Sequence, residues 1–150
     1  MPVGGLAGSE GHHPLARRVR VTRGCIAYCM SCEPAFDYAR ATHRTTLTQQ
    51  CARFISQHQS LGLAPTIALR PMKRRIEAHY VLEGGQAVSF VLQVVHPEDN
   101  DPCAPSDVEI GELFEHTVQF WNRCLGACTY EDRWREMVSR AALTLKLLTF

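Results

Sequence analysis

Seven cysteines are the residues of this 150-residue chain with the widest chemical repertoire: Cys25, Cys29, Cys32, Cys51, Cys103, Cys124 and Cys128. The first three have the short spacing at which thiolates can hold zinc in a tetrahedral site. On a strand, however, side chains alternate between faces, so Cys25 and Cys29 face one side and Cys32 the other. We therefore assign no metal ligand among them. The odd count favours reduced thiols over a disulfide framework.

The other candidates for metal or nucleophilic chemistry are scattered. Cys124 and Cys128 are four residues apart, but Gly126 between them favours the end of a helix. His12-His13 can bind a transition metal adventitiously, and the remaining histidines lack HExxH-type spacing. No GxSxG or cysteine-protease context surrounds a nucleophile, and no glycine-rich motif suits a nucleotide. We expect no cofactor, no cofactor-binding residue and no metal.

Three carboxylates near the end of the chain have the residue type that paired acid and base catalysis needs: Glu131, Asp132 and Glu136. They surround an expected helix start, where carboxylates interact favourably with the helix dipole. Glu136 also precedes Arg140 by four residues, the spacing of an ion pair on a helix surface. A structural role explains all three, and we name no catalytic residue.

Two further groups have a structural explanation that outweighs a functional one. A basic cluster at 70–75 suits a charged hairpin loop better than a phosphate or nucleic-acid contact; its members are Arg70, Lys73, Arg74 and Arg75. Trp121, Tyr130 and Trp134 suggest a platform for stacking sugars. Both tryptophans nevertheless fall on apolar helix stripes, which favours core or interdomain packing.

The composition is that of an ordinary globular protein, with 45% hydrophobic and 21% charged residues. A formal net charge of +1 gives no reason to expect nucleic acid or an anionic membrane as partner. No stretch approaches the roughly 18 uncharged apolar residues of a membrane span. Residues 1–16 are rich in Gly and His and lack the apolar core of a signal peptide, so we expect a flexible leader and a cytoplasmic protein.

Strand patterns occupy the first two thirds of the chain. A hairpin is predicted where alternating valines and arginines precede Arg23-Gly24 and the β-compatible run 26–32. The clearest hairpin is predicted at 76–95, around Gly84-Gly85. Gly62 and Pro65 limit the run 61–69 to an edge or irregular strand.

The two strands of the clearer hairpin differ in pattern, and this predicts the layers. Residues 76–83 alternate between apolar and polar, whereas 87–95 is apolar almost throughout. A half-exposed strand beside one buried on both faces predicts a two-layer β-sandwich with 87–95 central.

Helices are predicted after a Pro-rich loop at 96–105. Ser106 and Glu109 form a capping box, and the first apolar stripe keeps helical period up to Gly126. A second stripe continues to the last residues; its members are Trp134, Met137, Val138, Ala141, Leu145 and Leu148. No Gly, Asn or Pro ends this helix, so we expect more protein for the stripe to pack against and interpret the C-terminus as a truncation point.

Five segments, taken in order, resemble successive landmarks of one family. They are PAFDYARATHR (34–44), TIALRP (66–71), LEGGQAVSFVLQ (82–93), TVQFWNRCL (117–125) and RWREMVSRAALTLKLLTF (133–150). Together they are similar to bacterial proteins of glycoside hydrolase family 15, the glucoamylase and trehalase-like group, over residues 17–150. There are departures: Glu131 and Asp132 stand where Arg and Gly are usual, and Ala141 stands where Ser is usual.

The resemblance implies a division of the chain into four parts. Residues 1–16 are a leader, 17–105 part of the trehalase-like N-terminal β-domain, 106–128 a linker helix, and 129–150 the first helix of a truncated helical barrel. The family's catalytic glutamates lie far along that barrel, in sequence this chain does not contain. No catalytic residue is therefore carried over.

We thus expect a mainly β fold, a partial sandwich followed by helices, from a parent enzyme that hydrolyses α-glucosidic bonds with inversion. The chain itself is expected to be non-catalytic and structural. Its expected partner is the missing catalytic barrel, or a second copy bound through the C-terminal helix. The alternatives are a non-catalytic β-module that binds carbohydrate or protein through Tyr38 or Tyr130, and a thiol or metal protein.

Overall fold

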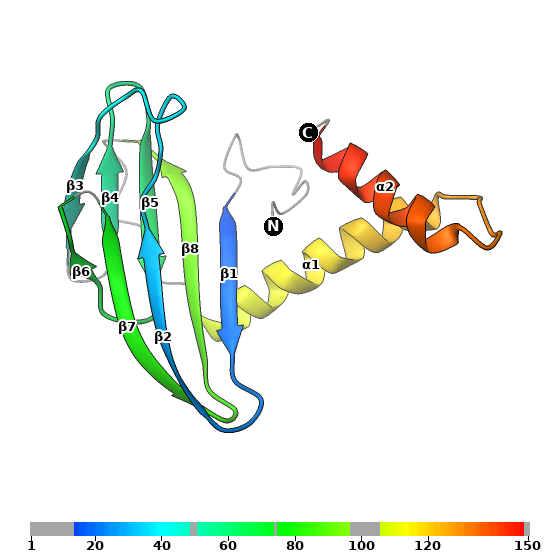
Figure 1. Cartoon of the computed structure of the whole chain (residues 1–150), viewed down its shortest axis with the longest axis horizontal. Helices are drawn as coiled ribbons and strands as arrows, with labels where there is room; N and C mark the ends of the chain where they lie inside the picture. Colours follow the sequence, from blue (N-terminus) through cyan, green and yellow to red (C-terminus); the bar gives the residue numbers. More distant parts are fainter. Residues whose placement is uncertain (1–13, 49–50, 74, 97–105, 149–150) are drawn as a thin grey trace.

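The fold, seen in a computed structural model, is described for residues 14–48, 51–73, 75–96 and 106–148. In these ranges eight strands precede two helices: β1 (Leu15–Arg20), β2 (Cys25–Cys32), β3 (Arg44–Leu47), β4 (Ala52–Ile55), β5 (Ser60–Pro65), β6 (Arg70–Pro71), β7 (Ile76–Glu83), β8 (Ala87–Val95), α1 (Asp107–Gly126) and α2 (Arg135–Leu148). The strands form one sheet of order β1-β8-β5-β4-β3 and one of order β2-β7-β6 (Figure 1). The predicted mainly β fold with C-terminal helices is confirmed.

Both predicted hairpins are wrong in their pairing, although their strands form. β1 pairs with β8 and β2 pairs with β7, so the two strands of each predicted hairpin lie in different sheets. The register runs from Leu15 opposite Leu92 to Arg20 opposite Ala87, and resumes at Cys25 opposite Glu83. One antiparallel ribbon therefore continues from the five-stranded sheet into the three-stranded sheet.

The bend of this ribbon is held by backbone hydrogen bonds. The Val21 N–H donates to Gln86 O at 3.1 Å, and the Gly85 N–H donates to Val21 O at 2.8 Å. Gly24 and Gly85 have φ values of +81° and +92°, which L side chains rarely adopt. The glycines that predicted hairpin turns thus allow the chain to pass between the layers, at the lower end of the sheets in Figure 1.

A single apolar core lies between the two sheets. Phe54, Ile76 and Val88 are its most deeply buried large side chains, and the Tyr80 and Phe90 rings meet across the layers with centroids 6.0 Å apart. β8 lies between β1 and β5, as predicted for an apolar central strand. β5 is also internal, against the prediction of an edge strand. It tolerates Pro65 because that proline is its last residue.

The helices form an arm beside the sandwich (Figure 1). The capping box is present: the Glu109 N–H donates to Ser106 Oγ at 3.2 Å, and the Ser106 N–H donates to Glu109 Oε2 at 2.7 Å. α1 ends at Gly126, as predicted, and buries Ile110 and Thr117, whereas α2 has no buried residue. Among the described residues, neither helix is apolar enough over its length to cross a bilayer.

Candidate functional site: a groove and an uncovered helical arm

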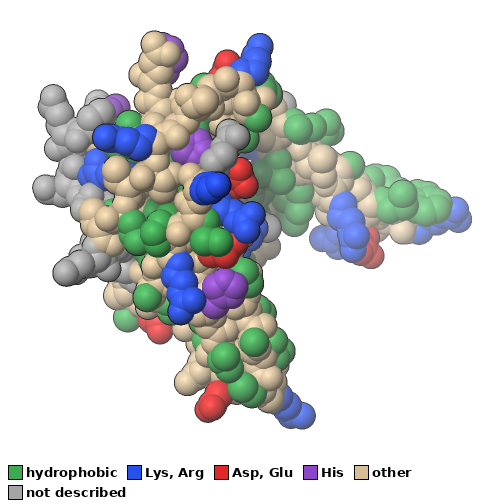
Figure 2. Space-filling model, turned by 60° about the vertical axis from the view of Figure 1, so that its left-hand side comes forward, with side chains coloured by type: hydrophobic (Ala, Val, Ile, Leu, Met, Phe, Trp, Pro, Cys, Tyr) green, Lys and Arg blue, Asp and Glu red, His purple; other side chains and the backbone are tan. Residues whose placement is uncertain are grey.

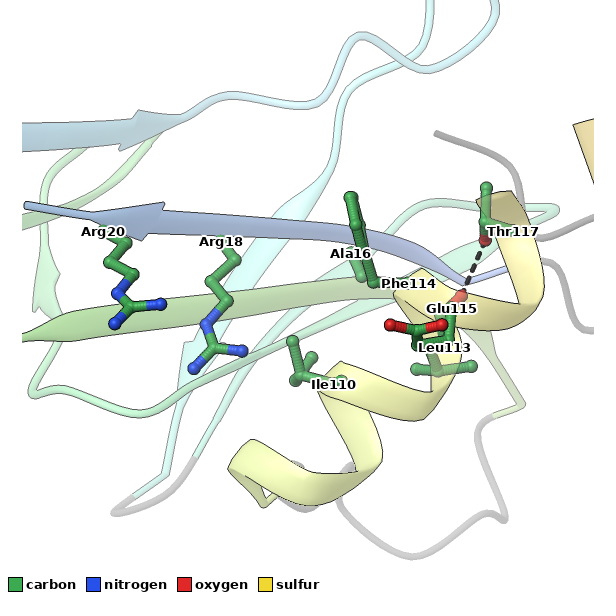
Figure 3. Close-up of a pocket in the computed structure, with 9 residues that line it drawn as sticks. Ala16, Arg18, Arg20, Ile110, Leu113, Phe114, Glu115 and Thr117 are labelled. Carbon is green, nitrogen blue, oxygen red and sulfur yellow. Dashed lines mark hydrogen bonds between the residues drawn. The ribbon is translucent and has the colours of Figure 1, made fainter. Parts of the chain in front are cut away.

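A groove of about 460 Å³ lies between β1 and the first half of α1 (Figure 3). Strand alternation turns Ala16, Arg18 and Arg20 toward it, because Val19 packs on the opposite side against the core. The helix contributes the rest of the lining: Ile110, Gly111, Leu113, Phe114, Glu115 and Thr117. The groove is therefore apolar on its helical wall and basic on its strand wall.

One weak ion pair joins the strand wall to the start of the helix. Arg18 Nη2 lies 3.4 Å from Asp107 Oδ1, and both side chains are substantially exposed, so the pair adds little stability. Ile110 is buried against the sheet, whereas Phe114 on the next turn is 66% exposed. An exposed aromatic residue beside a groove with one apolar wall is typical of a contact surface.

The apolar stripe predicted for α2 is not covered by the described residues. The half-buried residues of α2 are Val138, Ser139 and Leu143, and only Val138 of these belongs to the predicted stripe. Met137 and Leu145 are each 63% exposed, and Trp134 and Leu148 are also exposed. Hydrophobic side chains accordingly line the arm in the space-filling view (Figure 2). These exposed apolar residues of the arm thus lie along one stripe and are not scattered singly over the surface.

Two of the three candidate carboxylates, Asp132 and Glu136, make the local contacts expected at a helix start. Asp132 Oδ1 accepts from the Arg133 N–H at 2.7 Å, and Asp132 O accepts from the Arg135 N–H at 2.9 Å. Glu136 and Arg140 form the predicted ion pair at 2.6 Å, with both side chains exposed. Glu131 is exposed as well. None of the three lines the groove.

A proton donor for glycoside hydrolysis needs a carboxyl group whose pKa is raised. Two described carboxyl groups have a displaced pKa, and both are displaced downward. A hydrogen bond from His79, aided by Arg75, lowers the pKa of Glu77, and hydrogen bonds from the Ser106 backbone and hydroxyl lower the pKa of Glu109. Neither group is suited to donate a proton near neutral pH.

The aromatic residues form no shared platform among the described residues. Trp121 is half-buried against Phe120, and Trp134 is half-exposed beneath the Arg133 guanidinium, whose carbon lies 4.4 Å from the ring centroid. Tyr130 is half-buried. Tyr38 lies between β2 and β3, is 89% exposed and is approached by the Arg40 guanidinium. These positions do not favour the alternative of a carbohydrate-binding module.

The cysteines of β2 divide between its faces as predicted. Cys25 and Cys29 are exposed, whereas Cys32 packs against the core, where burial raises its pKa and the Arg17 charge partly opposes that shift. The six described cysteines form no disulfide with one another. Cys124 lies in α1 and Cys128 beyond its end. Cys103 and His12-His13 lie outside the described residues.

The structure brings together one group that sequence analysis missed. Cys29, Glu77 and His79 have ligand atoms that all lie within 4.8 Å of one another. Cys29 and His79 are opposite each other in the β2–β7 register, 50 positions apart in the chain. Only the strand pairing reveals the group, because no local motif links its members. Of the basic cluster, Lys73 and Arg75 lie in the hairpin loop between β6 and β7, as predicted, whereas Arg70 lies in β6 and Arg74 outside the described residues.

These features define a mainly β domain with a helical arm that the described residues leave largely uncovered. No family model matches the chain, and no solved structure matches it. The chain is 28% identical to a trehalase of Mycolicibacterium smegmatis over 154 aligned residues and 30% identical to a trehalase of Mycobacterium tuberculosis over 151. Each alignment covers 94% of the chain but 22% of the relative, so the chain spans about a fifth of the length of these curated relatives.

Proposed function

We propose that this chain is the non-catalytic β-domain and first helices of a trehalase-like glycoside hydrolase of family 15, with the cytoplasm as its compartment. The alignment with two mycobacterial trehalases, which takes in 94% of the chain, is the observation that carries this proposal. The ordered motifs at 34–44, 66–71 and 82–93 support the family. The parent activity is then inverting hydrolysis of an α-glucosidic bond, performed by residues outside this chain.

The role proposed for the chain is to pack against the catalytic helical barrel of that hydrolase. Met137, Leu145 and Phe114 support this role, because they are large apolar residues left exposed on one helical arm. Burying such a side chain contributes about 1.5–3 kcal/mol, so a few of them are sufficient to hold a domain interface. The arrangement of the described carboxylates supports a structural role over a catalytic one.

The proposal is tested by measuring glucose release from trehalose, maltose and a soluble α-glucan. The purified chain is assayed alone and after mixing with the polypeptide encoded immediately downstream of it. We expect no release by the chain alone and release from at least one substrate in the mixture. Activity of the chain alone would refute the non-catalytic role and direct attention back to Glu131, Asp132 and Glu136.

A variant pair locates the contact. Phe114→Lys places a charge in the groove. It is expected to lower glucose release in the mixture at least tenfold, because docking would then bury a charge and less apolar area. Val81→Lys is the matched control, since Val81 is similarly exposed but lies on the sheet of β2, β7 and β6. Equal glucose release in mixtures with Phe114→Lys and with Val81→Lys would show that the arm is not the docking surface.

A further inference from the structure

The residues Cys29, Glu77 and His79 share the solvent side of the three-stranded sheet. Cys29 lies directly opposite His79 in the β2–β7 register, and Glu77 is two residues before His79 on the same strand. Ile76 and Ala78, the strand neighbours of Glu77 and His79, are fully buried in the core, which fixes Glu77 and His79 on the outer face. Cys29 lies on the same face because it is the cross-strand partner of His79. The backbone of two paired strands thus holds all three side chains in place.

The contacts among these side chains converge on one atom. His79 Nε2 lies 3.9 Å from Cys29 Sγ and 3.3 Å from Glu77 Oε2. In a catalytic triad the imidazole uses one nitrogen toward the nucleophile and the other toward the carboxylate. Here the same nitrogen faces both partners. Three potential ligand atoms thus lie within 4.8 Å of one another, in an arrangement that differs from a proton relay.

We propose that Cys29 Sγ, His79 Nε2 and Glu77 Oε2 form a zinc-binding site. Thiolate, imidazole and carboxylate are the three side-chain ligand types of Zn²⁺, and a site with three protein ligands leaves a fourth position for water or another ligand. Bond lengths of about 2.0–2.3 Å in a tetrahedral site separate ligand atoms by about 3.4–3.6 Å. The distances from His79 Nε2 are 3.9 Å to Cys29 Sγ and 3.3 Å to Glu77 Oε2, and all three atoms lie within 4.8 Å of one another, so a change of about 1 Å in these distances brings the atoms to tetrahedral spacing.

The surroundings of the site favour an ordered carboxylate. Arg75 Nε donates to Glu77 Oε1 at 2.6 Å, which leaves Oε2 directed toward His79. The Glu77 side chain is only 13% exposed, whereas Arg75 and His79 are about half exposed. Such a hydrogen bond from outside the ligand set orients a metal ligand and contributes to its affinity. Arg75 lies in the turn between β6 and β7, where its backbone oxygen accepts from the Met72 N–H at 2.9 Å. This turn therefore helps to position the site.

The test is a titration of the reduced, metal-free chain with Zn²⁺ by calorimetry and with Co²⁺ by absorbance. The chain and each of its variants also carry His12→Ala and His13→Ala, because those two histidines can bind metal without the proposed site. We expect one Zn²⁺ per chain and a thiolate-to-cobalt charge-transfer band in the near ultraviolet. Cys29→Ser is expected to abolish the band, and His79→Ala is expected to weaken binding at least tenfold, since each removes one of three ligands.

Cys25→Ser is the matched control for Cys29→Ser, because Cys25 is exposed on the same face of the same strand and lies outside the cluster. It should leave stoichiometry and affinity unchanged. Unaltered binding in both Cys29→Ser and His79→Ala, or no binding once His12 and His13 are replaced, would overturn the site. This test is independent of glycoside hydrolysis, because it measures metal binding alone.

Discussion

At the scale of single residues, a left-handed turn is the least expected feature of the backbone. Asp37, Tyr38 and Ala39 have φ values of +46°, +55° and +66°, and none of them is glycine. The turn is closed by the Ala41 N–H donating to Phe36 O at 3.2 Å, and Arg40 bonds Asp37. Phe36 is buried in the core, so the turn is anchored at its base. For an L residue, the left-handed backbone conformation costs roughly 1–2 kcal/mol of conformational free energy.

This turn gives the first prediction. Ala39→Gly is expected to raise the free energy of unfolding by about 0.5–1 kcal/mol, because relief of the left-handed strain exceeds the entropy that glycine adds to the unfolded chain. Urea unfolding followed by circular dichroism measures the change. Ala35→Gly is the control: Ala35 is also exposed but has no positive φ, so it should destabilise by a similar amount. Destabilisation by both changes would contradict the assigned turn geometry.

The candidate site shows what residue patterns can and cannot predict. The opposite faces of Cys29 and Cys32 followed from strand alternation alone, because period two depends only on neighbouring residues. The grouping of Cys29 with His79 did not follow, since it depends on which strands pair. That pairing was predicted wrongly, so no reasoning from the sequence placed these two residues together.

At the scale of elements, the strands with the clearest patterns were predictable, whereas a short strand such as β3 and the pairing of strands were not. The alternation at 76–83 and the apolar run at 87–95 correspond to β7 and β8 as observed. Gly84-Gly85 indicated a sharp change of direction, which a hairpin and a passage between sheets both require. The choice between them is made by the core, because only the passage places Tyr80 and Phe90 on facing layers. Helix ends were more predictable, since caps are local.

The second prediction concerns the capping box of α1. Ser106→Ala is expected to destabilise the helix by about 1 kcal/mol, because the Glu109 N–H loses its acceptor. Hydrogen exchange of the first turn of α1 measures this loss. Ser106→Asn keeps an acceptor of similar strength and should change exchange little. Equal effects of the two substitutions would show that the cap does not hold the helix start.

The same box has a defined pH dependence. The pKa of Glu109 is lowered in the folded chain, so its contribution to stability is complete above the unfolded value of about 4.5 and is lost as pH falls through the lowered folded value. Protection of the first turn should therefore decrease on acidification below about pH 4.5. In Glu109→Gln this acid-dependent decrease should be smaller.

At the scale of the whole molecule, the two parts differ in how completely they are packed. The sandwich buries large side chains from both sheets in one core, whereas the helical arm buries Ile110 and Thr117 and leaves the second helix without a buried residue. A helix of fourteen residues is marginal without an apolar face packed on something. The arm should thus depend on a partner more than the sandwich does.

The third prediction follows from this imbalance and concerns the purified chain without the downstream polypeptide. Its exposed arm should cause concentration-dependent self-association and binding of a hydrophobic dye. Met137→Lys combined with Leu145→Lys is expected to weaken association at least tenfold, because burial of each side chain contributes about 1.5–3 kcal/mol and about 1.4 kcal/mol is tenfold. Thr22→Lys with Val81→Lys adds the same charge at exposed sites away from the arm and should leave association unchanged. Sedimentation velocity distinguishes these outcomes. A sharp monomeric boundary for the unsubstituted chain, together with no dye binding, would contradict an exposed apolar arm.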